Sequence, residues 1–216
     1  MADVRTLPHL FSPLTIRNVV LRNRIVSTAH VTNLAENGVP GDRLIAYHVA
    51  RARGGVGLII TGATPVHPSS TSRFTRSIRN WDDSIIAPYR RLSAALHDFG
   101  ARVFAQLNHS GAQGGSEGSF RYVVAPSPVD AELSKETPHA LDVDEIQEIV
   151  SAFAAAAARA RAGGLDGVEL HGGHGNLIQQ FLSPLTNRRT DAYGGNLENR
   201  LRFAREVITA VRRAVG

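Results

Sequence analysis

The sequence predicts an α/β fold in which four parallel strands alternate with helices, and three observations carry this prediction. Short apolar runs alternate with longer amphipathic segments, which is the pattern of repeated strand–helix units. Glycine pairs, Gly54-Gly55 and Gly163-Gly164, end two helices just before the next apolar run. The loops after the strands are long, whereas these glycine connections are short. This asymmetry favours part of a (β/α)8 barrel, the TIM-barrel architecture, over an open doubly wound sheet.

The loop after the first strand also disfavours the open doubly wound sheet. A dinucleotide-binding sheet carries a glycine-rich phosphate loop after its first strand, and Ser27-Thr28-Ala29-His30 offers none.

The first quarter of the chain is expected to form a hairpin, a strand and a helix. Residues 10–24 alternate around the turn-like Arg17-Asn18, which predicts a β-hairpin ahead of the main fold. Arg24–Ala29 then form the first strand of the sheet, which ends at His30. Asp42 is suited to cap a helix that runs to about Arg53.

The second and third units follow the same order. Val56–Ala63 is apolar on both faces, as a buried parallel strand should be. Pro88 begins a helix whose apolar residues recur at helical spacing until Gly100 ends it. Arg102–Asn108 is the third strand, which ends at His109.

The fourth unit begins after an irregular segment, residues 123–141, which we expect to line the rim of a site. Asp142 or Asp144 begins the longest helix, Gly167–His171 is the fourth strand, and a final helix spans about Asn196 to Ala214. No linker divides the chain. Residues 1–216 are therefore expected to form one domain, whose four βα units are half of a (β/α)8 barrel.

Composition limits the function classes. With 43% hydrophobic and 20% charged residues, the chain is that of a globular protein, and without cysteine it holds no disulfide or thiolate metal ligand. No apolar run reaches the roughly 18 residues that a membrane span needs, and Met1–Arg5 lacks a secretory pattern, so a cytoplasmic protein is expected. The net charge of +5 is spread along helices without a basic patch that suits nucleic acid.

Histidines gather where the predicted strands end. In chain order these ends carry His30, then Ala63 with His67 beyond it, then Gln106 with His109, then His171 with His174. The carboxyl ends of parallel strands meet at one edge, which is where ligands bind in this class of fold. Neutral imidazoles at such an edge bind a metal or hydrogen-bond an electron-rich oxygen of a ligand.

A metal site is the first alternative. Two histidines three residues apart, with others from neighbouring strands, could hold zinc and activate water for hydrolysis. The strand ends lack a carboxylate partner, because Glu169 alternates with Val168 and Leu170 and is expected to point elsewhere. We therefore assign no metal ligands.

A flat organic cofactor over the strand ends is the second alternative. The amide of Gln106 can present a donor and an acceptor to an imide-like ring edge. The small Ala63 and the backbone of Thr28-Ala29 would let such a ring approach closely. His171 and His174 would then hold the oxygen of a substrate stacked on the ring, while the cofactor moves the hydride.

Several motifs in the chain strongly resemble the Old Yellow Enzyme family, and most closely its 2,4-dienoyl-CoA reductase-like NADH:flavin oxidoreductases. The matching segments cover essentially the whole chain: Leu10–Ile16, Asn23–Val26, Gly54–Ile60, Gln106–Gly111, His171–Pro184, Asn187–Gly195 and Glu198–Arg200.

The resemblance implies an FMN-binding TIM barrel with an N-terminal hairpin beneath it. By that likeness Thr28, Ala29, His30 and Val31 contact the flavin after the first strand, Ala63 and Gln106 contact its ring, and His171 with His174 lies beside the ring and holds a substrate carbonyl oxygen. Similar enzymes reduce FMN with NAD(P)H and pass hydride from flavin N5 to an activated alkene, of the enone or dienoyl thioester type. The polarised oxygen lowers the barrier as an oxyanion hole does.

One departure from the family concerns proton delivery. Where alkene-reducing relatives carry a tyrosine, this chain has Asn176, whose carboxamide cannot act as a comparable acid. The proton would then come from water or a tyrosine such as Tyr122. The alternative is the family's other chemistry, the oxidative N-demethylation or dehydrogenation of methylated amines.

A second departure concerns the extent of the chain. The family's flavin-phosphate sites lie on later strands than the four found here. The resemblance therefore implies that residues 1–216 are the amino-terminal part of one FMN-binding (β/α)8-barrel domain, with about its first four βα units. The chain would then be a piece of a longer protein, whose remainder could hold an iron–sulfur cluster and FAD, or a half barrel that self-associates as a homo-oligomer. The remaining hypothesis is that this chain is a fragment without catalytic activity of its own.

Overall fold

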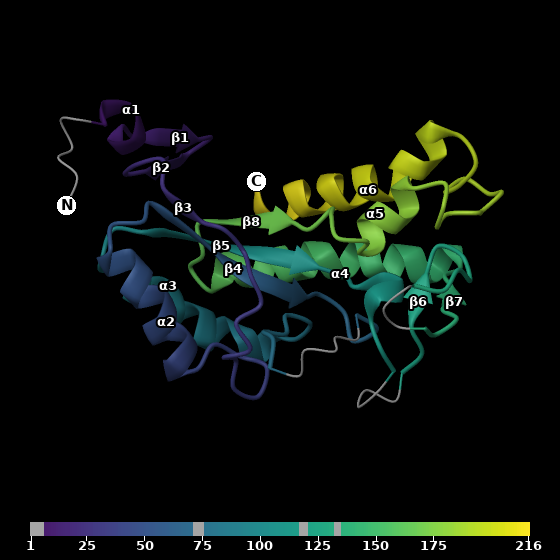
Figure 1. Cartoon of the computed structure of the whole chain (residues 1–216), viewed down its shortest axis with the longest axis horizontal. Coiled ribbons are helices and arrows are strands. Elements are labelled where there is room, and N and C mark those ends of the chain that lie inside the picture. Colours follow the sequence, from purple (N-terminus) through teal and green to yellow (C-terminus); the bar gives the residue numbers. More distant parts are fainter. Residues whose placement is uncertain (1–6, 71–75, 117–120, 132–134) are drawn as a thin grey trace.

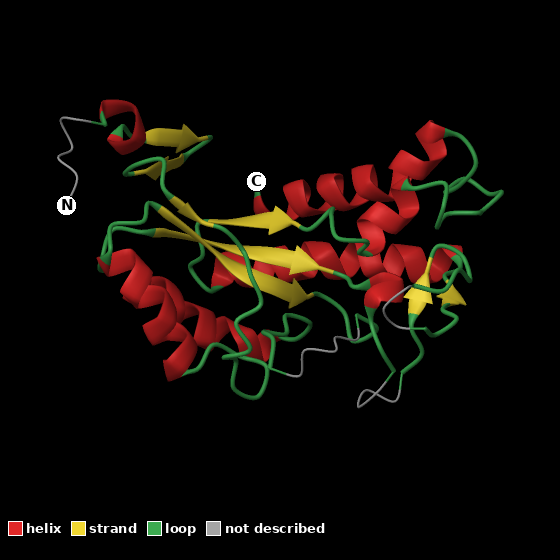
Figure 2. Ribbon diagram, viewed as in Figure 1, coloured by secondary structure: helices red, strands yellow, loops and turns green. Residues whose placement is uncertain are grey.

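The computed structural model describes residues 7–70, 76–116, 121–131 and 135–216, and its elements follow the predicted order (Figures 1 and 2). A short helix α1 (Pro8–Phe11) leads into strands β1 (Leu14–Ile16) and β2 (Val19–Leu21), which pair antiparallel around Arg17-Asn18. The predicted hairpin is thus confirmed. Met1–Arg5, read above for a secretory pattern, lies outside the described residues.

The central sheet contains four parallel strands in chain order, β3 (Val26–Ser27), β4 (Leu58–Pro65), β5 (Arg102–Asn108) and β8 (Gly167–Leu170). All carboxyl ends therefore meet at one edge, as predicted. The first strand is shorter than the predicted range Arg24–Ala29, because only Val26 and Ser27 find register partners on β4. Strand β4 in turn runs two residues past Ala63, through a register shift between Thr61 and Thr64.

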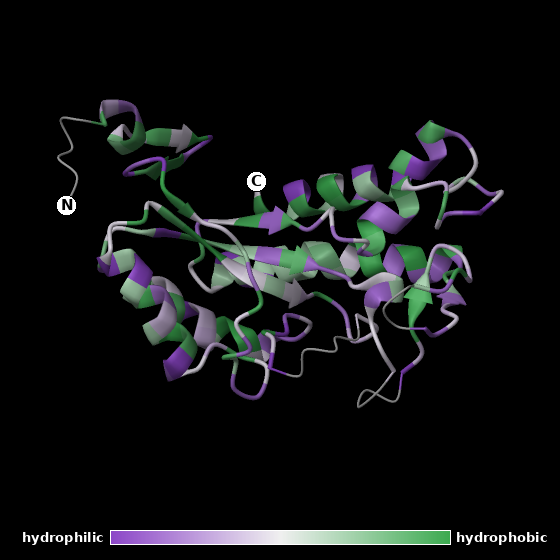
Figure 3. Cartoon of the chain, in the orientation of Figure 1, coloured by the Kyte–Doolittle hydropathy of each residue, from purple (hydrophilic) through white to green (hydrophobic). Residues whose placement is uncertain are grey.

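Helices cover one face of this sheet. They are α2 (Asp42–Arg53), the 3-10 turn η2 (Asp83–Ile85) with α3 (Ile86–His97), α4 (Val143–Ala162), α5 (Leu177–Leu182) and α6 (Leu197–Val215). Figure 3 shows apolar and polar residues alternating along α6, the pattern of a helix with one buried side. Asp142 and Glu145 form a capping box at the start of α4, which fixes one of the two helix starts that the sequence left open.

Alternate strand residues divide the core into two layers. Ile59, Val103, Ala105 and Leu107 belong to the main cluster with the helices. Leu58, Ile60 and Phe104 face the other way and meet Leu21 of the hairpin in a smaller cluster. Successive side chains on a strand point to opposite faces, so Gln106 shares the face of Phe104. We call this hairpin-side face the inner face.

The inner face is less covered than the helical face. Phe104, Gln106 and the whole of β8 are only half-buried. A groove of about 440 Å³ lies between the hairpin, β8 and α6. Within the described residues, no helix is both long and apolar enough to cross a bilayer.

The irregular segment predicted for residues 123–141 contains two short parallel strands, β6 (Val124–Ala125) and β7 (His139–Ala140). They stand beyond the carboxyl ends of the sheet, next to the 3-10 turn η3 (Gly111–Gln113) (Figure 1). The segment therefore lies on the same side as the strand ends, which agrees with its predicted place at a rim.

Candidate functional site

The loop after β3 carries four of the predicted cofactor contacts, Thr28, Ala29, His30 and Val31. The Nδ1 of His30 lies 3.2 Å from the carbonyl oxygen of Thr28, and its Nε2 bonds the Tyr47 hydroxyl of α2. A carbonyl only accepts, so Nδ1 carries the proton and Tyr47 donates to Nε2. The position of the His30 ring is thus fixed by its own loop and by α2.

Glycine at position 62 lets this loop lie against β4. A Cβ atom built on Gly62 would stand 2.1 Å from the carbonyl oxygen of His30, so any side chain there would push the loop away. Ala63 follows with only a methyl group. The backbones of the first two strand ends therefore stay close to each other.

Gln106 lies on the inner face of β5, and its Nε2 donates to Glu169 Oε1 across 2.7 Å. The two residues are direct partners in the β5–β8 register. This overturns the expectation that Glu169 points away from the site. Glu169 and His171 are two residues apart on one strand line, so the alternation places both on the inner face. Glu169 orients the Gln106 amide, whose oxygen and second N–H have no partner among the described residues.

The two predicted catalytic histidines are adjacent in space at the end of β8. His174 Nδ1 lies 3.2 Å from His171 Nε2, and the ring centroids are 5.0 Å apart in an edge arrangement. Burial, with a smaller effect of His174, lowers the pKa of His171. His171 is therefore neutral near pH 7, and the pair shares one internal hydrogen bond while each ring keeps one nitrogen for a ligand.

Asn176 follows this pair and is the N-cap residue of α5, with 9% of its surface exposed. Its side chain makes no capping hydrogen bond. Tyr122, the other residue considered as a proton source, is exposed and lies edge-on to His139, with centroids 5.1 Å apart.

His67 and His109 lie in a chain of hydrogen bonds apart from the His171 and His174 pair. His109 Nδ1 accepts from the Gly111 amide at 3.1 Å, so its Nε2 carries the proton and donates to Ser69 Oγ at 3.0 Å. Ser69 donates to His67 Nδ1 at 2.7 Å, and His67 Nε2 donates to Glu148 at 3.2 Å. We call these four residues the buried histidine chain after His109, which is buried at one end, while Glu148 at the other end is exposed.

Every nitrogen of the two imidazoles in this chain is used. Burial, followed by the effect of His67, lowers the pKa of His109 to about 3, so His109 stays neutral. The sequence marked both histidines as strand-end candidates, but neither has a nitrogen left for a ligand. Ser69 and Glu148 were missed, since nothing in a linear pattern connects them to His109.

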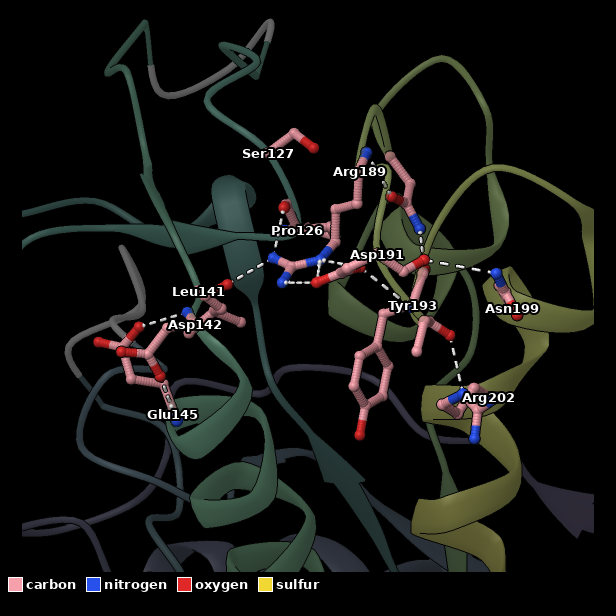
Figure 4. Close-up of polar contacts among 12 residues, drawn as sticks. Pro126, Ser127, Leu141, Asp142, Glu145, Arg189, Asp191, Tyr193, Asn199 and Arg202 are labelled. Carbon is pink, nitrogen blue, oxygen red and sulfur yellow. Dashed lines mark hydrogen bonds and ion pairs between the residues drawn. The ribbon is translucent and has the colours of Figure 1, made fainter.

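Arg189 is a further residue that the sequence did not single out. Its guanidinium donates to the carbonyl oxygens of Pro126 and Leu141 and pairs with Asp191, as Figure 4 shows. These bonds join the β6–β7 region to the loop between α5 and α6. The Arg189 guanidinium also lowers the pKa of Asp191. Arg189 therefore holds the β6–β7 region and the loop between α5 and α6 together.

The described residues contain no group of three or more histidine and acidic side chains placed to hold a metal ion. They give the zinc hydrolase hypothesis no support.

Comparison with known proteins gives a consistent result. Residues 9–216 match the family model described as NADH:flavin oxidoreductase / NADH oxidase. The chain is 47% identical over 213 residues to an NADH oxidase of Thermoanaerobacter brockii, covering 97% of this chain and 32% of that protein. It is 36% identical to the "Multifunctional alkene reductase/demethylase OYE" of Caballeronia cordobensis, covering 96% of this chain and 31% of the relative.

A solved structure of morphinone reductase in complex with tetrahydroNAD is similar to this chain with a TM-score of 0.90 and 34% identity. The similarity covers 97% of this chain and 61% of that one. The four βα units and the hairpin thus have the fold predicted from the sequence, part of a TIM barrel. The chain spans about a third of the two curated relatives.

Proposed function

The chain belongs to the NADH:flavin oxidoreductase / NADH oxidase family, and from this premise we propose that it takes part in the NAD(P)H-driven, FMN-dependent reduction of an activated C=C bond. The substrate class is an enone or a dienoyl thioester. Family membership confirms the resemblance to Old Yellow Enzyme, and the reaction itself is our proposal. The observation that carries it is the pair of neighbouring imidazoles, His171 and His174, just after the end of β8, the strand that pairs with the strand of Gln106.

The donor groups on the inner face fit a flavin ring. Among the residues that the structure describes, the amide oxygen and one N–H of Gln106 have no partner, and together they complement an imide edge. Glu169 fixes the orientation of that amide through its 2.7 Å hydrogen bond. The Thr28 to Val31 backbone and the small Ala63 would line the ring on the side of the first two strands. FMN bound here would supply the hydride transfer.

The two histidines would hold the carbonyl oxygen of the substrate. Their mutual hydrogen bond of 3.2 Å leaves the accepting ring with its N–H pointing outward. An oxygen that enters between the rings replaces that bond, and it accepts from both rings once the accepting ring has moved its proton to the facing nitrogen. Neutral donors suit this task, because they stabilise negative charge that develops on the oxygen as the adjacent alkene is reduced. The lowered pKa of His171 keeps it in this neutral form.

Asn176 supports a second candidate function, the oxidative N-demethylation of a methylated amine. Reduction of an alkene needs a proton at the α-carbon, and the carboxamide of Asn176 cannot give one near neutral pH. Removal of hydride from an amine needs no such acid. The Caballeronia cordobensis relative is named for both activities.

One set of experiments with purified protein tests these proposals. The chain is titrated with FMN, and then with NADH or NADPH in the absence of oxygen. We expect binding and bleaching of the flavin absorbance, and reoxidation when an enone such as cyclohexenone is added. If a methylated amine reduces the oxidised flavin while no enone reoxidises the reduced form, the demethylase proposal replaces the reductase.

Absence of FMN binding would contradict a flavin role for the chain by itself and leave the non-catalytic fragment. The same titration on the protein encoded by the whole gene is the control, because the chain spans only a part of its relatives.

A further inference from the structure

The loop that carries the paired histidines has an unusual backbone. His174 and Gly175 are consecutive residues in the left-handed region, with φ of 56° and 70°. Glycine adopts this conformation readily, whereas a non-glycine residue adopts it at an energetic cost, which is smaller for histidine than for most residues. The conformation of His174 decides whether its ring reaches His171. Something in the structure must therefore fix it.

Two neighbouring glutamines of α5 hold the Gly175 peptide groups from both sides. The N–H of Gly175 donates to Gln179 Oε1 at 2.7 Å. The carbonyl oxygen of Gly175 accepts from Gln180 Nε2 at 2.5 Å. The two bonds need opposite chemistry, because Gln179 acts as an acceptor and Gln180 acts as a donor.

Gln180 also joins the histidine loop to the loop after β5. Its side chain is buried, and its Nε2 donates to the Ser110 carbonyl at 3.3 Å while its Oε1 accepts from the Ala112 amide at 3.1 Å. Gly111 between them has φ of 57°, and a Cβ there would lie 2.3 Å from Gln180 Oε1. The Gln180 amide thus hydrogen-bonds both the loop after β5 and the loop after β8.

We infer that Gln179 and Gln180 are positioning residues that lock His174 into the left-handed conformation and so keep its ring beside His171. The inference rests on the proposed function for its consequence in catalysis. The lock itself depends only on contacts within the chain. If Gln179 and Gln180 are released, the turn keeps its backbone bond from the Asn176 N–H to the Gly173 carbonyl oxygen at 3.1 Å but loses both side-chain bonds to Gly175. We expect His174 to move and the two rings to separate.

Two matched substitutions test the inference, because the same chemical change has opposite expected results. In Gln179→Glu a carboxylate oxygen still accepts from the Gly175 amide. In Gln180→Glu the donor is lost, and carboxylate oxygens face the carbonyl oxygens of Gly175 and Ser110. Gln179→Leu is the third variant. Gln179 is exposed, so this change removes the acceptor without opening the core.

Three measurements are made on each variant: hydrogen exchange of the Gly175 amide, NMR titration of the His171 ring, and kcat and KM of the flavin-loaded protein. For Gln179→Glu we expect all three within about threefold of wild type. For Gln179→Leu and Gln180→Glu we expect Gly175 exchange to rise by about tenfold, the scale of one lost hydrogen bond. The value of kcat should fall by about tenfold or more in these two variants, because a misplaced histidine donor stabilises the transition state less.

The His171 titration separates positioning from a merely structural role. His174 helps to lower the pKa of His171, so the pKa should move back toward its ordinary value when the rings separate. Unchanged exchange and titration in both Gln179→Leu and Gln180→Glu would overturn the inference. So would equal losses in Gln179→Glu and Gln180→Glu, which would point to added charge. If wild type neither binds FMN nor turns over, the proposed function fails, while the exchange and titration still decide the lock.

Discussion

The molecule contains two pairs of histidines at neighbouring strand ends, and they differ in what their nitrogens do. His171 and His174 at the end of β8 share one hydrogen bond and are otherwise open on the inner face. His67 and His109, beyond β4 and β5, lie 6.4 Å apart between ring centroids and are joined through Ser69. The first pair has donor and acceptor capacity to offer a ligand. The second has none.

The difference shows that residue type and strand-end position do not identify a binding histidine. What separates the two pairs is hydrogen-bond saturation. A buried imidazole with both nitrogens bonded adds rigidity and cannot release a bond without leaving a buried polar group unpaired. A half-exposed imidazole with a spare nitrogen can exchange its partner for a ligand at little cost. The predictions below test this contrast, beginning with the largest expected effect.

The replacement His171→Ala should reduce turnover most and change stability little. Loss of one donor to a developing oxyanion typically lowers kcat by about 100- to 1,000-fold. Since His171 is half-buried with a single side-chain bond, we expect the free energy of unfolding to change by less than about 1 kcal/mol. NAD(P)H oxidation with an enone and urea unfolding measure the two effects. An activity within a few-fold of wild type would remove His171 from the proposed site.

His109→Ala should give the reverse result. It leaves the Gly111 amide without its acceptor, removes the donor to the Ser69 hydroxyl and opens a cavity, so we expect a loss of about 2–4 kcal/mol in unfolding free energy. Turnover of the folded protein should fall far less than in His171→Ala. The exposed His9→Ala is the control, with a change within about 0.5 kcal/mol. Equal stability of the His109 and His9 variants would refute the structural role of the buried histidine chain.

The buried pair should also make stability depend on pH. The pKa of His109 is lowered from 6.5 to about 3 in the folded protein, so below pH 6.5 the unfolded state binds the extra proton. Stability is complete above 6.5 and falls with decreasing pH toward 3, by at most about 1.4 kcal/mol per pH unit from this group. His109→Gln should flatten that part of the curve. Urea unfolding of both proteins across this range gives the difference, in which the carboxylate contributions cancel.

Ser69→Ala should have the smallest effect. It removes one hydroxyl between the imidazoles of His67 and His109, which corresponds to about 1 kcal/mol. The exposed Ser151→Ala on α4 is the matched control and should lie within about 0.5 kcal/mol of wild type. If Ser69→Ala were as mild as the control, the link through Ser69 would not hold the pair together.

The fold could be predicted from the sequence because its elements have local signatures. The bounds of β5 agree with the apolar pattern, and those of α2, α4 and α6 differ by a residue or two. In α2 the cap is Gly41, and Asp42, the predicted cap, is the first helical residue. The length of β3 could not be predicted from the sequence, because a strand ends where its neighbour stops pairing with it. Of the predicted strand, Val26 and Ser27 alone pair with β4. Local periodicity contains no information on that register.

The site was predictable in part for the same reason. His171 and His174 are three residues apart, so one loop brings them together. The contact of His67 with Glu148 joins residues 81 positions apart, and no local pattern predicts it. Glu169 was misassigned although the alternation contained the answer, since its spacing from His171 puts both on one face. Gln180 gave no signal because its partners are backbone groups of two separate loops.

The left-handed backbone at position 174, with φ of 56°, limits which amino acids can occupy it. Among non-glycine residues, asparagine, aspartate and histidine enter this region most readily, and β-branched residues are effectively excluded. Of the three tolerated types, histidine and asparagine can donate a hydrogen bond from a neutral side chain. Histidine and asparagine therefore meet both the conformational and the chemical requirement. His174→Asn is the replacement that we expect to keep both the backbone conformation and a neutral hydrogen-bond donor at this position.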